Sequence, residues 1–300
     1  MMVRSLDPVE SEIRLAHGAA VAVIKLVGAE PVAWSVNGRD LLWRGDARWW
    51  VQSAPILFPI VGRLRGGRVR IGADVHAMAI HGFARAMPFA VVERAADRVR
   101  LVLTQNAETL ASYPFPFSLT LDYRLSDTTL SVAFVLSNPG EAPLPYALGF
   151  HPGFRWPFAG GDPEAYAVVF GEEERAEVPV ITADGLFSRA QRTVPLVEKR
   201  LLLSHDLMSD EALCFLHARS KDVRFVAPDG TSIGVTAEDF PHFALWSRPP
   251  GPFLCIESWT GFGDPDDFEG DIATKPSMRW LAPGGEARHA VHMDFDEARR

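Results

Sequence analysis

The stretch Leu119-Thr-Leu-Asp-Tyr-Arg-Leu125 decides the fold class of this chain. Apolar residues occupy every odd position from 119 to 125, and polar residues occupy the even positions between them. This period of two is typical of a β-strand that buries one face. A polar turn at 126–128 follows, and a second β-rich run extends from 129 to 136. The two runs predict an antiparallel hairpin.

The same pattern extends along the rest of the chain. Asn37-Gly38 and Asp229-Gly230 tolerate positive φ and suit two-residue hairpin turns. The strands expected around these turns and elsewhere are 31–36, 40–43, 223–227, 231–235, 99–103 and 253–257. Short helical turns are expected only at 107–112 and 206–212. The pattern therefore predicts an all-β fold, with residues 1–300 forming one antiparallel domain.

Composition excludes several classes of protein. The 300 residues are 47% hydrophobic and 23% charged, which is ordinary for a globular chain. With 38 acidic against 30 basic residues, the net charge of −8 predicts no affinity for nucleic acid or for an anionic membrane surface. The longest apolar stretch, 19–24, is too short to span a bilayer. Two cysteines form no disulfide framework, and the first fifteen residues lack the apolar core of a secretory signal, so we expect a cytoplasmic protein.

Four stretches interrupt the alternation by placing polar side chains among aromatic residues, glycine and proline. They are Ser53-Ala-Pro-Ile-Leu-Phe-Pro-Ile-Val-Gly-Arg63-Leu-Arg65-Gly-Gly, His81-Gly-Phe-Ala-Arg85, Gly149-Phe-His-Pro-Gly-Phe154 and Phe253-Leu-Cys-Ile-Glu257-Ser-Trp259-Thr-Gly261. Arg63 is either a surface charge beside a Gly-Gly turn or a fork for hydroxyls or carboxylates. His81 is either a hydrogen-bonded core histidine or a ligand-binding residue.

His151 and Glu257 are the strongest candidates for chemistry. Pro152 restricts the backbone at His151, and the flanking phenylalanines would enclose its imidazole. On an extended strand, Glu257 shares a face with apolar and aromatic residues, where a carboxylate is costly to bury unless it is paired or functional. Burial would raise its pKa toward that of a useful base. The alternatives are a core histidine and an exposed glutamate at a sheet edge.

Other motifs of catalysis are absent from the sequence. It contains no Gly-rich phosphate loop, no G-x-G-x-x-G and no G-x-S-x-G elbow. His81, His151 and Glu257 leave open a facial metal triad, although the stretches around them do not favour it.

Taken in order, the four stretches resemble the successive signatures of the aldose 1-epimerase (galactose mutarotase-like) family, and within it the LacX-like subgroup. The matching segments are LFPIVGRL at 57–64, HGFAR at 81–85, GFHPGF at 149–154, Ile256-Glu-x-Trp259-x-Gly261, and the tail KPSMRWLAPGGE at 275–286. The resemblance covers roughly residues 41–295. One such motif is weak, whereas several in the same order are specific.

The resemblance implies a single large antiparallel β supersandwich. It implies that Glu257 is the general base that removes the proton of the anomeric C1 hydroxyl, and that His151 is the general acid that protonates the ring oxygen. Arg63 and His81 match residues that hold sugar hydroxyls. No metal or organic cofactor is implied, and the partner is a small sugar, with the protein a monomer or a homodimer.

The sequence also departs from the family pattern. Ser258 stands where the family often has proline, and the further aspartate of the family has no clear counterpart. Its candidates are Asp206, Asp210 and Asp239. Trp246 and Trp259 either stack on the apolar face of the sugar or belong to the core.

Four functions follow as hypotheses. The leading one is an aldose 1-epimerase acting on a free aldose. A hexose-6-phosphate 1-epimerase is the near alternative and requires clustered arginines for the phosphate. A non-catalytic carbohydrate-binding or sensor protein on the same fold, and a metal-dependent isomerase or lyase, are the alternatives from other classes.

Overall fold

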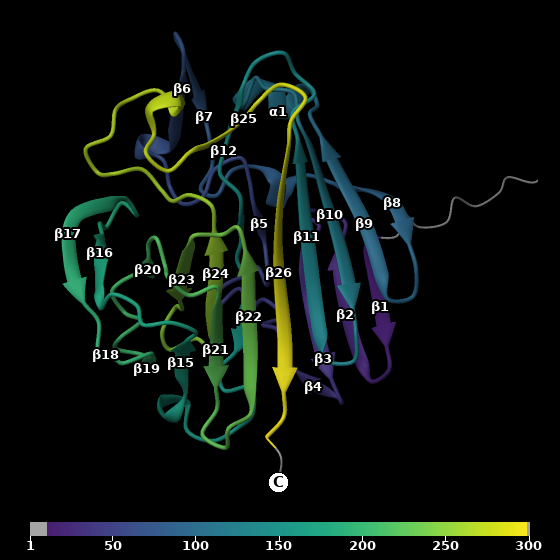
Figure 1. The fold of residues 1–300 in the computed structure, drawn as a ribbon, viewed down its shortest axis with the longest axis vertical. Coiled ribbons are helices and arrows are strands. Elements are labelled where there is room, and N and C mark those ends of the chain that lie inside the picture. The colour runs from purple at the N-terminus through teal and green to yellow at the C-terminus, as the bar shows by residue number, and fades with distance from the viewer. Residues whose placement is uncertain (1–10, 299–300) are drawn as a thin grey trace, which may run out of the picture.

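The computed structural model describes residues 11–298 and is built of antiparallel strands (Figure 1). Residues 1–10, part of the segment in which no secretory signal was expected, lie outside this range. The largest sheet has ten strands in the order β18 (Leu196–Val197), β19 (Arg200–Leu202), β15 (Ala167–Phe170), β21 (Asp222–Val226), β22 (Ser232–Glu238), β26 (Glu286–Asp296), β11 (Thr129–Ser137), β10 (Ser118–Leu125), β9 (Arg98–Thr104) and β8 (Ala90–Arg94). That residues 1–300 form one domain stays a prediction.

Two smaller sheets complete the main framework. A four-stranded sheet contains β1 (Glu12–His17), β2 (Ala20–Lys25), β3 (Pro31–Val36) and β4 (Arg39–Asp40). A six-stranded sheet contains β20 (Leu213–Phe215), β23 (His242–Trp246), β24 (Phe253–Trp259), β13 (Gly149–Phe150) and β5 (Ile56–Leu57), with β14 (Gly153–Arg155) also paired to β24. Both lie behind the ten-stranded sheet in the view of Figure 1.

The remaining elements are short. Three two-stranded ribbons pair β6 (Arg68–Ile71) with β7 (Asp74–Ala77), β12 (Leu144–Tyr146) with β25 (Arg279–Leu281), and β16 (Glu177–Ile181) with β17 (Phe187–Thr193). One α-helix, α1 (Ala107–Ser112), and four 3₁₀ turns, η1 (Arg65–Gly67), η2 (Ala84–Ala86), η3 (Pro163–Ala165) and η4 (Ile272–Thr274), occur in the described residues. None of these helices is long and apolar enough to cross a bilayer.

One large apolar cluster joins the three main sheets. The strand that decided the fold class, β10, buries Leu119, Leu121 and Tyr123 and pairs with β11 in the register Leu121↔Phe134. Leu15 of β1 and Ile256 of β24 belong to the same cluster. The predicted alternation is therefore confirmed, because the odd positions of β10 face the other sheets.

Three local predictions need correction. Residues 206–212 form turns rather than a helix, with Ser204 Oγ accepting the amide of Leu207. At the second hairpin only Gly230 has a positive φ (88°), because the Asp229 carboxylate accepts the Thr231 amide and shapes a different turn. At the first hairpin both Asn37 and Gly38 have positive φ, as expected.

The strand expected at 40–43 ends at Asp40. The amides of Leu41 and Leu42 both point to the carbonyl of Trp34, at 2.9 and 3.4 Å, which disrupts the ladder. The amide of Trp43 then donates to the carbonyl of Gly153. The chain thus leaves the four-stranded sheet and reaches the six-stranded one beside β14.

Candidate active site

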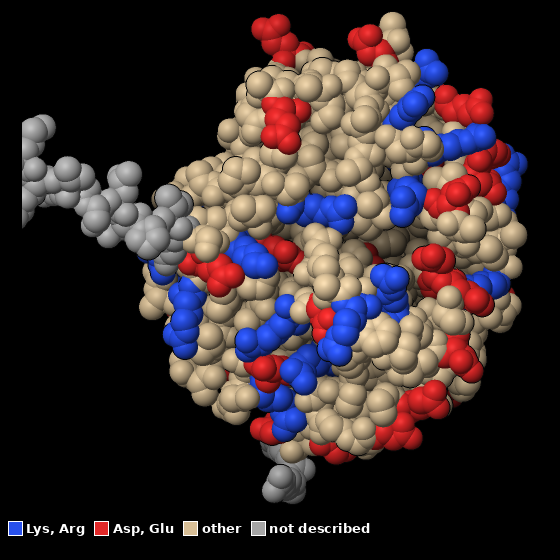
Figure 2. Space-filling view, turned by 180° about the vertical axis from the view of Figure 1, so that it is seen from behind, with Lys and Arg blue, Asp and Glu red and all other residues tan. Residues whose placement is uncertain are grey.

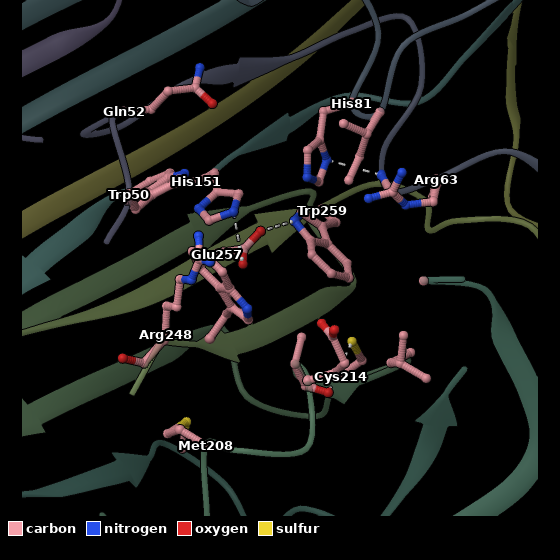
Figure 3. A pocket seen from close by; sticks show the side chains of 18 of the residues that line it. Trp50, Gln52, Arg63, His81, His151, Met208, Cys214, Arg248, Glu257 and Trp259 are labelled. Atoms are coloured by element: carbon pink, nitrogen blue, oxygen red, sulfur yellow. Dashed lines mark hydrogen bonds and ion pairs between the residues drawn. The ribbon is translucent and has the colours of Figure 1, made fainter. Parts of the chain in front are cut away.

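A cavity of about 650 Å³ lies over the outer face of the six-stranded sheet (Figure 3). Strand β24 forms its floor because its residues alternate between two environments. Leu254 and Ile256 enter the main core, whereas Glu257 and Trp259 line the cavity. The sequence predicts that Glu257 and Trp259 share one face of the strand. Only the fold shows that this face lines an enclosed cavity, and that Glu257 is not exposed at a sheet edge.

His151 stands directly opposite Glu257 because β13 and β14 are two parts of one interrupted strand. Phe150 pairs with Ser258 on one side of the break, and Gly153 pairs with Cys255 on the other. Continuing this register across the break aligns His151 with Glu257. Pro152 has no N–H to donate to a ladder, whereas the amide of His151 continues the β13–β5 register by donating to the carbonyl of Pro55 at 3.2 Å.

The two side chains are in contact and almost fully buried. His151 Nε2 lies 3.2 Å from Glu257 Oε1, and the residues are 6% and 2% exposed. The other carboxylate oxygen, Oε2, accepts a hydrogen bond of 3.0 Å from the indole Nε1 of Trp259. Glu257 is therefore held at both oxygens, and one of its partners is a group that can carry a proton.

Burial dominates the electrostatics of this pair. It raises the pKa of Glu257 well above its usual value and lowers the pKa of His151 to about 3. The hydrogen bond from Trp259 opposes the rise at Glu257. Both shifts disfavour a net charge, so the pair carries one proton in total across a wide range of pH.

Glycines on either side of His151 make room for two tryptophans. A Cβ at Gly149 would lie 3.0 Å from the Trp259 ring, and one at Gly153 would lie 2.8 Å from the Trp50 ring. Trp50 stacks on the imidazole of His151, with ring centroids 4.9 Å apart. The GFHPGF motif therefore serves to seat His151 between aromatic rings and opposite a carboxylate.

His81 is fixed in one tautomer beside His151. The Gly62 amide donates to His81 Nδ1 at 3.1 Å, so the proton of the neutral ring resides on Nε2. Burial lowers the pKa of His81 well below its usual value, and the charges of His151, Arg85 and Arg63 act in the same direction. The rings of His81 and His151 lie 5.6 Å apart. His81 is thus a neutral hydrogen-bond donor.

All six residues predicted for the site line the cavity, and they come from five separate stretches of chain. They are Arg63, His81, His151, Trp246, Glu257 and Trp259. In Figure 3 His81 and Arg63 lie on the Trp259 side of the His151–Glu257 pair. Trp246 meets His151 edge-on, with centroids 5.8 Å apart, so it contributes a wall rather than a proton.

Sequence reasoning missed part of the lining. The residues not predicted include Trp50, Gln52, Arg85, Met208, Cys214 and Arg248. Arg85 stood inside the HGFAR segment and was the one with a usable signal. Cys214 lies opposite Ala244, which itself lies opposite Glu257, so it faces the cavity two strands away. Burial raises the pKa of its thiol well above the usual value.

The aspartate candidates do not reach the cavity. Asp239 pairs with Arg279, and Asp210 pairs with Arg192 at 3.4 Å. Asp206 belongs to the turn that precedes Met208 and does not line the cavity. The acidic residues of the lining are Glu257 and the exposed Glu211.

No metal centre emerges from the geometry of the described chain. Across residues 11–298, no three or more His, Cys, Asp or Glu side chains are grouped so that they could hold a metal ion. The facial triad of His81, His151 and Glu257, considered from sequence, is therefore not formed.

Comparison with known proteins places this architecture in a family. The model of the aldose 1-epimerase family matches residues 11–289. The LacX protein of Lactococcus lactis subsp. lactis, in plasmid and chromosomal forms, is 30% identical over 259 residues, which cover 82% of this chain and 86% of LacX.

Solved structures agree with the sequence match. A galactose mutarotase related enzyme from Lactobacillus acidophilus superposes with a TM-score of 0.89 at 27% identity, covering 96% of this chain and 98% of the other. A galactose mutarotase-like protein from Lactobacillus casei gives a TM-score of 0.88 at 28% identity, covering 95% and 100%. The fold and the ordered motifs meet in one conclusion: the chain belongs to the aldose 1-epimerase family.

Proposed function

We propose that this protein is an aldose 1-epimerase that interconverts the α and β anomers of a pyranose sugar. The observation that carries the proposal is the buried contact of 3.2 Å between His151 and Glu257 in a cavity large enough for a sugar. Opening a cyclic hemiacetal requires one proton to leave the C1 hydroxyl and another to reach the ring oxygen. A carboxylate and an imidazolium side by side supply these two transfers.

The reaction begins when Glu257, as the carboxylate, accepts the proton of the C1 hydroxyl. The C1–O bond to the ring oxygen breaks as His151 donates its Nε2 proton to that oxygen. The products are the open aldehyde, a protonated Glu257 and a neutral His151. Rotation about C1–C2 exposes the other face of the aldehyde, and the reverse transfers close the ring as the opposite anomer.

The proton count of the pair matches this cycle. The pair holds one proton throughout. Burial favours the neutral form, with the proton on Glu257 at rest, and transfer of that proton to His151 across the 3.2 Å contact forms the reactive ion pair. Ring opening then returns the pair to its neutral form, with a proton on the carboxylate. The pair therefore passes from one form to the other without exchanging a proton with bulk water.

Other cavity residues orient the sugar. His81 presents an Nε2 proton to a hydroxyl, and Arg63 offers its guanidinium from the same side of the pair. Trp50, Trp246 and Trp259 supply aromatic faces for the C–H surface of the ring. These contacts place C1 and the ring oxygen within reach of the two proton-transfer groups.

The test is the rate at which freshly dissolved α-D-glucose and α-D-galactose approach anomeric equilibrium, followed by polarimetry or anomeric proton NMR. We expect acceleration by the protein and a loss of at least 100-fold in Glu257→Gln. Glu238→Gln is the matched control, because it makes the same change at an exposed position at the end of β22. Full activity in Glu257→Gln would disprove the role of Glu257. Sugar binding without acceleration by the native protein would indicate a carbohydrate sensor.

A further inference from the structure

Glu257 is a buried carboxyl group with few neighbours that could stabilise its charge. Across residues 11–298 no lysine or arginine lies within ion-pair distance of it, and its contact with a chargeable group is the one to His151 at 3.2 Å. Charged side chains of both signs are spread over the face behind the ten-stranded sheet (Figure 2), where water screens them. The ionised form of Glu257 therefore depends on a group inside the cavity.

The indole of Trp259 is such a group. Its Nε1–H donates to Glu257 Oε2 at 3.0 Å, and this hydrogen bond opposes the rise in pKa that burial causes at Glu257. Figure 3 shows the two carboxylate oxygens engaged separately, one by His151 and the other by Trp259. The indole thus favours the charged form of the carboxyl group without being charged itself.

Packing fixes the position of this N–H. Trp259 is 4% exposed and lies in a buried apolar cluster that includes Leu57 and Phe187. Gly149 stands opposite Trp259 in the strand register, and a Cβ at Gly149 would lie 3.0 Å from the indole ring. The direction of the N–H is therefore set by the fold around the ring, before any sugar binds.

The indole also determines which oxygen carries the proton at rest. An indole N–H can only donate, so Oε2 acts as its acceptor and the acid proton of Glu257 resides on Oε1. Oε1 is the oxygen that lies 3.2 Å from His151 Nε2. The proton therefore starts on the atom from which it passes to the imidazole. Once it has passed, the hydrogen bond at Oε2 becomes one to a carboxylate and is strengthened.

We propose that Trp259 is a positioning residue for the epimerase reaction: its indole N–H keeps the acid proton on Oε1 and stabilises the Glu257 carboxylate of the reactive ion pair. This role is separate from any contact between the face of its ring and the sugar. The inference rests on the proposed epimerase function, so its test must distinguish the two.

The other titratable groups around Glu257 do not supply this stabilisation. Burial raises the pKa values of Cys255, two residues earlier on β24, and of Cys214, on β20, so both thiols are neutral. Burial lowers the pKa of His81 well below its usual value, so that ring is neutral as well. Glu211 of the same lining is exposed to water. The cavity arginines, which form no ion pair with Glu257, are Arg63, Arg85 and Arg248.

Trp259→Phe removes the N–H and keeps an aromatic ring in the cluster. The assay is anomeric NMR with whichever of glucose and galactose the native protein converts faster. We expect kcat to fall about 10- to 100-fold and KM to change less than about threefold, because the lost bond is one to a charged group. The alkaline limit of kcat should move to higher pH, since without the donor the pair gives up its single proton less readily. A loss expressed in KM, or an alkaline limit that moves to lower pH, would overturn the inference.

Trp34→Phe is the matched control. Trp34 is buried in the main apolar cluster, and its Nε1 has no hydrogen-bond partner among residues 11–298, so the same substitution removes packing alone. We expect this variant to retain the native kcat. A fall equal to that in Trp259→Phe would assign both losses to packing and overturn the inference. No acceleration by the native protein would instead overturn the proposed function, and the role of Trp259 with it.

A second measurement does not depend on the folding of Trp259→Phe. The indole N–H signal of Trp259 is compared by NMR in the native protein and in Glu257→Ala, which lacks the acceptor. We expect the signal to move upfield in the variant and to exchange faster with solvent, because the hydrogen bond at 3.0 Å is lost. An unchanged signal would show that the indole does not bind the carboxyl group, and would overturn the inference.

Discussion

Glu257 and His151 titrate as one unit. They are buried and in contact, so adding a proton to the pair or removing its single proton creates a net charge inside the protein. A second proton on the pair would protonate both groups and remove the base. Burial lowers the pKa of His151 to about 3, so this loss occurs only in strong acid. Loss of the single proton would remove the acid. Because burial raises the pKa of Glu257, this loss occurs only at a higher pH than for an ordinary glutamate.

The expected pH profile follows from these directions. After subtraction of the uncatalysed rate, kcat for ring opening should be level through neutral pH and should fall as the pH approaches about 3. Anomeric NMR from acid to alkaline pH provides the measurement, with circular dichroism to confirm that the protein is folded at each point. A fall in kcat centred near pH 6.5, the usual pKa of histidine, would contradict a buried, coupled pair.

At the scale of elements, the interrupted strand of β13 and β14 sets the geometry of the acid. Gly153 has no positive φ, so alanine fits its backbone, but the new Cβ would lie 2.8 Å from Trp50. In Gly153→Ala we expect Trp50 to move off His151 and the epimerase rate to fall about tenfold, with a loss of stability of about 1–3 kcal/mol. Anomeric NMR and urea unfolding provide the two measurements.

A second glycine separates the two effects. Gly284 has a φ of 69° and no neighbouring atoms at its Cβ position, and it lies outside the cavity. Gly284→Ala should cost about 1 kcal/mol from backbone strain while the native rate is retained. A rate in Gly153→Ala equal to that in Gly284→Ala would argue against an orienting role for Trp50.

Strands were predictable from this sequence wherever one face is buried. β10 and β11 follow their apolar alternation, and α1 was predicted at its observed bounds. The turn at 206–212 was mistaken for a helix because the Ser204 hydroxyl accepts the amide of Leu207, and the amides of Met208 and Ser209 donate to carbonyls three residues back. Such local competition is not visible in apolar periodicity.

At the scale of the whole molecule, a buried ion pair ties the late part of the chain to the loop that bears Arg63. Lys275 Nζ lies 2.7 Å from Asp264 Oδ1, and Asp264 Oδ2 accepts the amide of Arg65 at 2.9 Å. The amide of Asp264 also donates to the carbonyl of Arg63. The KPS segment of the tail therefore supports the position of Arg63, a cavity-lining residue far away in sequence.

Removing one charge of this pair should be costly. In Lys275→Met we expect a loss of about 3–5 kcal/mol in the free energy of unfolding, since an unpaired Asp264 would remain buried. Urea denaturation measures the loss. The double variant Lys275→Met with Asp264→Asn should recover part of it, because no charge is then left unpaired. Additive losses in the double variant would show that the two residues are not coupled.

The site illustrates what sequence can and cannot show at this scale. Glu257 and His151 stood out in the sequence because each places an ionisable side chain among apolar and aromatic residues, where burying it costs free energy. Arg248 and Gln52 were missed because neither stands out among its neighbours in sequence. Arg248 finds its partner, the carbonyl of Trp49, 199 positions away in sequence, and Gln52 finds Arg85, 33 positions away. Asp206, Asp210 and Asp239 were candidates because of their positions in the chain, but the fold does not bring them to the cavity.

The pairing of His151 with Glu257 through strand register has a consequence for how such proteins diverge. His151 and Glu257 are spaced by the strand register of the sheet, whereas Arg63, Arg85 and Arg248 are presented by loops and turns. Insertions or replacements in those loops can therefore alter which sugar is accepted and leave the proton-transfer machinery intact. Substrate specificity can therefore change between related proteins while the buried pair of His151 and Glu257 stays the same.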